Sequence, residues 1–121
     1  MTPRRGRLLG GLPPDGGEEA FEPLLETPFG RVERIVSFGH ASPAGFWYEQ
    51  AEDEWVLLAA GSATLTFEDG SSFMLTTGDW ALLPAGLRHR VDAVSTDAVW
   101  LAVHLRTASP TNTGEDPSPA G

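Results

Sequence analysis

The sequence contains no cysteine, and this absence removes three kinds of chemistry at once. Disulfide bonds, thiolate metal sites and cysteine nucleophiles are all excluded. Any metal ion must therefore be held by nitrogen and oxygen ligands. Only three histidines, His40, His89 and His104, are available to supply imidazole nitrogen.

Lysine is also absent, so all eight positive charges are arginines, set against 17 acidic residues and a formal net charge of −9. Three of these arginines lie within the first seven residues, which makes the remainder more acidic still. Nucleic-acid binding depends on a basic surface that displaces counterions from phosphates, and anionic membranes attract the same kind of surface. The sequence therefore predicts no nucleic-acid and no membrane partner.

Long apolar runs are missing as well, since none approaches the ~20 residues that a membrane-spanning helix needs. The first ten residues are basic but lack the apolar stretch of ~7–15 residues typical of an export signal. We therefore expect residues 1–20 to be a flexible leader and the protein to be cytoplasmic. Residues 107–121 contain no large apolar side chain, and we expect a disordered tail because burial cannot offset the entropy of ordering. The predicted domain spans residues 21–106.

The predicted domain consists of short β-type runs separated by turn residues, without helical periodicity. Residues 63–67 alternate with period two, and the following Asp69-Gly70 is a strong hairpin signal. Strands are predicted at 31–38, 46–50, 55–59, 63–67, 72–75, 80–84, 89–93 and 99–105. About eight short strands without a long amphipathic helix predict an all-β sandwich or barrel.

The segment from Gly78 to His89 resembles the second characteristic motif of the cupin family. That motif is Gly, five residues, Pro, one residue, Gly, two residues and His, followed after three residues by Asn. Gly78, Pro84, Gly86 and His89 match it, and only the last position departs, where Ala93 replaces Asn. The resemblance implies the cupin double-stranded β-helix, a jelly-roll barrel similar to that of RmlC-like proteins.

The first cupin motif is degenerate in this sequence. Its second half is matched by Glu54, followed after six residues by Gly61. Tyr48 and Gln50 occupy the positions of two histidines that cupins typically use as metal ligands. The resemblance implies one divalent transition metal inside the barrel, with Glu54 and His89 as the best ligand candidates.

The period of a β-strand predicts which side chains accompany His89. Side chains two positions apart share a face, so an inward His89 implies that Val91 and Ala93 also point inward. A hairpin turning near Thr96 would pair His89 with His104, and directly opposed residues of an antiparallel pair share a face. A slip of one residue would reverse this prediction for His104.

Two histidines and Glu54 would form a 2-His-1-carboxylate set, which suits iron(II) with open positions. Imidazole and carboxylate also bind Zn, Mn or Ni, so the ligand types do not select the metal. The predicted metal ligands are Gln50, Glu54, His89 and His104; the predicted pocket-lining residues are Tyr48, Val91 and Trp100. Alternatively, His89 is a hydrogen-bonded core residue, and a buried Glu54 has a raised pKa or a histidinium partner.

Two functions of different classes remain open at this point. The resemblance implies a metal-dependent small-molecule enzyme: a dioxygenase, an isomerase or a lyase. The alternative is a non-catalytic ligand-binding or sensor cupin without tightly bound metal, which the loss of both first-motif histidines favours. Fold does not decide between them. The aromatic residues Phe46, Trp47 and Trp55 would suit the interface of a homodimer.

Overall fold

The computed structural model describes residues 2–14 and 18–107, and all its regular elements are β-strands. These are β1 (Ala20–Thr27), β2 (Gly30–Ser37), β3 (Asp53–Ala60), β4 (Ser62–Phe67), β5 (Ser72–Thr76), β6 (Trp80–Leu83), β7 (His89–Val94) and β8 (Ala98–Leu105). No helix in this part of the chain has the length and apolar character needed to cross a bilayer. The all-β prediction is therefore confirmed.

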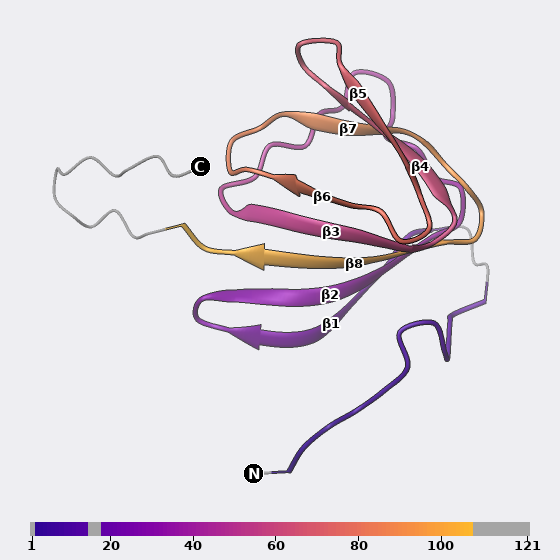
Figure 1. The fold of residues 1–121 in the computed structure, drawn as a ribbon, viewed down its shortest axis with the longest axis vertical. Coiled ribbons are helices and arrows are strands. Elements are labelled where there is room, and N and C mark those ends of the chain that lie inside the picture. The colour runs from indigo at the N-terminus through magenta and orange to yellow at the C-terminus, as the bar shows by residue number, and fades with distance from the viewer. Residues whose placement is uncertain (1, 15–17, 108–121) are drawn as a thin grey trace, which may run out of the picture.

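The strands form two antiparallel sheets, one of five strands in the order β1-β2-β8-β3-β6 and one of three in the order β5-β4-β7 (Figure 1). Consecutive strands β3 and β4 lie in different sheets, as do β7 and β8. Gly61 makes the first of these crossings with φ of +94°, and a Cβ there would collide with Ser95 Oγ and lie 2.8 Å from Ala98 Cα. Only glycine accepts both the backbone angle and the close approach. The result is a jelly-roll arrangement.

The core lies between the two sheets and follows the period-two alternation of the strands. Val56 and Leu58 of β3 face Leu65 and Phe67 of β4, and each of these side chains is buried. Because alternate residues point to opposite faces, the residues between them face away from the core.

Seven of the eight predicted strands overlap observed strands, but the prediction of a strand at 46–50 is wrong. In that segment only Tyr48 pairs, through an isolated bridge with His89. Conversely, β1 was not expected. It pairs with β2 along nearly its whole length, and its exposed side chains give little apolar alternation by which to recognise it.

One predicted pairing, that of His104, and one predicted orientation, that of Ala93, are also wrong. His104 does not pair with His89, because β8 pairs with β2 and β3, whereas β7 pairs with β4. Ala93 is exposed, because the register of β4 with β7 shifts between Leu65↔Val91 and the next pair. This bulge inserts one residue and reverses the alternation beyond it.

Residues 8–11 lie against the outer face of β2. Arg34 Nη1 donates hydrogen bonds to the carbonyl oxygens of Leu8 and Gly10 at 3.0 and 2.6 Å, and Nη2 donates to that of Gly11 at 3.3 Å. The flexibility expected for residues 1–20 as a whole stays a prediction. From residue 108 onward, the expected tail lies outside the described residues.

Candidate functional site

A cavity of about 290 Å³ lies between the two sheets. It is lined by all seven residues predicted from the sequence: Tyr48, Gln50, Glu54, His89, Val91, Trp100 and His104. They come from three strands and from the loop before β3. Residues from distant parts of the chain therefore meet around one space.

The two motif segments hold each other in place through backbone hydrogen bonds. Tyr48 N donates to His89 O at 2.7 Å, and His89 N donates to Tyr48 O at 3.0 Å. In the loops before β7 and β3, Gly86 N donates to Gln50 O at 2.8 Å. Gly86 has a φ of +83°, which favours glycine. Gly86 and His89 of the second motif thus position Gln50 and Tyr48, which replace the two histidines of the first motif.

Tyr48 and His89 form one aromatic wall of the cavity. Their rings stack with centroids 5.5 Å apart, and His89 Nδ1 lies 3.1 Å from the carbonyl oxygen of Leu87. This leaves His89 Nε2 directed to the Glu54 side, 3.9 Å from Glu54 Oε1. Burial lowers the pKa of the His89 imidazole and raises that of the Tyr48 phenol, so both groups favour their neutral forms near pH 7.

Glu54 and His104 are direct neighbours in the register of β3 with β8. Both side chains are buried, with exposed fractions of 8% and 2%. Glu54 Oε2 lies 3.8 Å from His104 Nε2, while its other oxygen faces His89. The inward orientation expected for His104 is therefore correct, although its strand partner is Glu54 and not His89.

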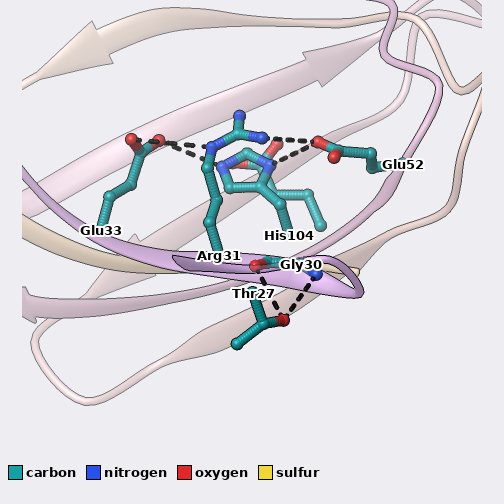
Figure 2. A network of polar contacts seen from close by, with 7 residues as sticks. Thr27, Gly30, Arg31, Glu33, Glu52 and His104 are labelled. Atoms are coloured by element: carbon teal, nitrogen blue, oxygen red, sulfur yellow. Dashed lines mark hydrogen bonds and ion pairs between the residues drawn. The ribbon is translucent and has the colours of Figure 1, made fainter. Parts of the chain in front are cut away.

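A network of charged residues that the sequence did not single out surrounds His104. Glu33 Oε1 accepts a hydrogen bond from His104 Nε2 at 3.1 Å, and Arg31 Nη1 donates to Glu52 Oε1 at 2.9 Å. In Figure 2 the Arg31 side chain reaches over the His104 ring, with Glu33 at one end and Glu52 at the other. The alternation of Arg31, Glu33 and Ile35 on β2 was the available signal, but the sequence alone did not show that β2 lies beside β8.

The Glu54 carboxyl is the most strongly perturbed acid of the site. Its pKa is raised from 4.5 to about 7, first because burial disfavours the carboxylate and second because Glu33 repels it. Glu52 adds to this repulsion, and Arg31 partly offsets it. A carboxyl that titrates near neutral pH can both accept and release a proton, which ordinary exposed glutamates do poorly at pH 7.

The described side chains do not fit a preformed metal set of three or more ligands. One ion with ~2.1 Å bonds could span either Glu54–imidazole distance taken alone. The two imidazoles, however, face different oxygens of Glu54, and Glu33 already accepts from His104 Nε2. Within residues 2–14 and 18–107, no group of three or more His, Asp or Glu is arranged to hold an ion. Metal binding by Gln50, Glu54, His89 and His104 therefore stays a prediction.

The family model for the cupin domain matches residues 39–104, which include both motif segments and the cavity strands from β3 to β8. The chain belongs to the cupin family. No curated protein sequence is significantly similar to it.

Solved cupin structures share the whole architecture. A Ralstonia eutropha protein named as a candidate mannose-6-phosphate isomerase is 42% identical, with a TM-score of 0.83, covering 87% of this chain and 100% of its own. A cupin superfamily protein from Desulfitobacterium hafniense is 18% identical, with a TM-score of 0.72 and coverage of 88% and 94%. An RmlC-like cupin from Desulfovibrio desulfuricans is 14% identical, with a TM-score of 0.70 and coverage of 86% and 97%. The last two similarities concern the fold alone.

Proposed function

We propose that this cupin is an isomerase of small polar molecules, in which Glu54 moves a proton between neighbouring carbon atoms. The observation that carries the proposal is the Glu54 carboxyl itself, which lines an internal cavity and has a pKa of about 7. General acid–base catalysis is most efficient when the pKa lies near the working pH, and contributes roughly 10²–10⁴-fold. The name of the 42% identical Ralstonia protein adds support from the same class of reaction.

The proposed reaction leaves the atoms and the charge of the substrate unchanged. The Glu54 carboxylate accepts a proton from the carbon beside a carbonyl group, and an enediol forms as the carbonyl oxygen gains a proton from a neighbouring acid. The Glu54 carboxyl then returns its proton to the adjacent carbon, while the other hydroxyl group loses one. The Tyr48 hydroxyl group, beside Glu54 in the cavity wall, is suited to donate to the carbonyl oxygen and to recover a proton from the other hydroxyl group. Neutral His89, whose Nδ1 donates to Leu87 O, presents Nε2 as an acceptor for a substrate hydroxyl group.

Solvent deuterium exchange tests this proposal across a range of candidate substrates. The purified protein is incubated in D₂O with a panel of aldoses, ketoses and smaller hydroxycarbonyl compounds, and NMR follows the hydrogen on the carbon beside the carbonyl. We expect exchange with at least one compound, and its loss by about 10²-fold or more in Glu54→Gln. The matched control is Glu68→Gln, since Glu68 is exposed on the β4–β5 turn and does not line the cavity. Equal exchange by the wild type and Glu54→Gln would reject the role of Glu54.

A non-catalytic binding cupin is the second candidate, and one observation favours it. Gln50 Oε1 is buried without a hydrogen-bond partner in the described residues, so the amide can hold a ligand without taking part in any reaction. Under this alternative, a ligand would raise the melting temperature of the protein, no compound would exchange deuterium, and Glu54→Gln would leave the shift in place.

Elemental analysis tests the metal-dependent form of the enzyme predicted from the sequence. A stoichiometric transition metal that disappears in both Glu54→Ala and His89→Ala would support it. A protein that exchanges deuterium while free of metal would assign the chemistry to the side chains alone.

A further inference from the structure

Among the described residues, three glutamates and one arginine line the cavity, and that arginine is already paired. Glu19, Glu33 and Glu54 line it. Arg31 Nη1 donates to Glu52 Oε1 at 2.9 Å, and its Nε lies 4.0 Å from Glu33 Oε2. A guanidinium between two carboxylates has little attraction left for a further anion.

Other arginines of the barrel point elsewhere. Arg34 lies on the outer face of the five-stranded sheet, paired with Glu22. The Arg88 and Arg90 guanidinium groups flank Trp47, at 5.7 and 5.8 Å from its ring, and neither lines the cavity. A phosphate group inside the cavity would therefore meet carboxylates without a free cation from the described residues, which is unfavourable at low dielectric.

One unpaired polar atom of the cavity lining requires a hydrogen-bond donor. Gln50 Oε1 is a buried acceptor without a partner in the described residues. The buried Nδ1 atom of His104 faces Glu52 Oε1 at 3.7 Å, and Glu52 does not line the cavity. The acceptor that a ligand can reach is therefore Gln50 Oε1. An ammonium group has three donors and no acceptor, whereas a phosphate dianion has only acceptors.

Aromatic rings complete the lining. Tyr48 and Trp100 both line the cavity, and the face of such a ring attracts a cation. The same ring does nothing comparable for an anion.

From these contacts we propose that the cavity selects a small molecule carrying a protonated amine and no phosphate group. This inference rests on the proposed function in that it names the charge of the substrate of that site. The proposed substrate of this chain thus differs from the sugar phosphate in the name of the Ralstonia protein.

Binding of matched probes tests the inference without any turnover. The probes are benzylamine, benzyl alcohol and benzyl phosphate, which share one apolar body and differ in the charge of the head group, together with mannose and mannose 6-phosphate. Calorimetry and saturation-transfer NMR give the affinities. We expect benzylamine to bind about tenfold or more tightly than benzyl alcohol, and each phosphate to bind more weakly than its neutral parent. Stronger binding of either phosphate, or no binding by benzylamine, would overturn the inference.

Two further measurements assign the preference to the acidic lining. In Glu33→Gln the advantage of benzylamine over benzyl alcohol should shrink several-fold, whereas the exposed control Glu68→Gln should keep it. Should Glu33→Gln not fold, the salt dependence of the wild type decides: added NaCl should weaken benzylamine binding and leave benzyl alcohol unaffected. Salt-independent benzylamine binding would contradict an electrostatic origin.

The outcomes separate this inference from the proposed function. If benzylamine binds preferentially but no compound exchanges deuterium, the charge selectivity is retained and the isomerase is rejected. If a sugar phosphate binds tightly and exchanges deuterium, the isomerase is retained and the charge selectivity is rejected.

Discussion

The two faces of the five-stranded sheet contrast sharply in what they bury and what they expose. On the inner face, the neighbouring strands β2, β8 and β3 place three polar side chains in one row, Arg31, His104 and Glu54. On the outer face, the exposed side chains of the edge strand β6 are apolar, with Trp80 60% and Leu82 53% exposed. Both faces thus depart from the usual division of apolar inside and polar outside.

Each departure carries a free-energy cost, and the costs differ in kind. Burying Glu54 removes a carboxylate from water, which is unfavourable unless it is protonated or paired. Exposing Trp80 leaves apolar surface in water, which association with another molecule would remove. We therefore expect different tasks for the two faces of this sheet, chemistry on the inner face and association on the outer face.

The largest effect we predict comes from removing the buried acid of the inner face. Because the pKa of Glu54 is raised to about 7, the folded state holds this proton more tightly than the unfolded state. The contribution of Glu54 to the free energy of unfolding therefore falls as the pH rises through the window from 4.5 to about 7. A glutamine side chain cannot titrate, so Glu54→Gln does not suffer this loss. The free energy of unfolding of Glu54→Gln minus that of the wild type should therefore increase by up to roughly 3 kcal/mol from below the window to above it. Urea unfolding on both sides of the window measures the difference.

Glu68→Gln is the control for this experiment, because Glu68 is an exposed side chain with the same chemical change. It should leave the pH dependence of stability as in the wild type. If Glu54→Gln and the wild type lost stability in parallel as the pH rises, the inner face would not hold a perturbed acid.

A smaller loss is expected at a buried charge of the outer face. Arg34 Nε donates to Glu22 Oε1 at 2.7 Å, and the guanidinium also binds three carbonyl oxygens of residues 8–11. Arg34→Met keeps the apolar stem and removes the donors, which should lower the free energy of unfolding by about 2 kcal/mol. It should also increase amide hydrogen exchange in residues 8–11. The exposed Arg106→Met should do neither, and unchanged exchange in Arg34→Met would show that this segment is held by other contacts.

The smallest predicted effect concerns association through the apolar row of the outer face. Trp80 stacks on Trp55 with centroids 6.1 Å apart, and Leu82 pairs with Trp55 across the strands. We expect a homodimer in light scattering that Trp80→Glu weakens by about tenfold or more. The control is Met74→Glu, since Met74 is also highly exposed but lies on β5 in the other sheet. A wild type that is monomeric at all tested concentrations would reject this prediction.

Local patterns predicted most strands and the residues of the site, because alternation and turn residues act over short distances. Glu54 and His89 were found through motif spacing, and the structure brings them to 3.9 Å. The partner of His104 was not predictable in this way, because the jelly-roll crossing sends β7 and β8 to different sheets. Glu33 was missed for the same reason: its role depends on β2 lying beside β8, a pairing between distant segments.

The most direct test of the account is the titration of Glu54 itself. Carbon-13 NMR of the glutamate side-chain carboxyls, assigned by the signal that disappears in Glu54→Gln, gives its pKa in the folded protein. We expect this one resonance to titrate near pH 7, because burial and the Glu33 charge both raise the pKa of Glu54. A Glu54 resonance that titrates near the ordinary 4.5, alongside the exposed glutamates, would contradict it.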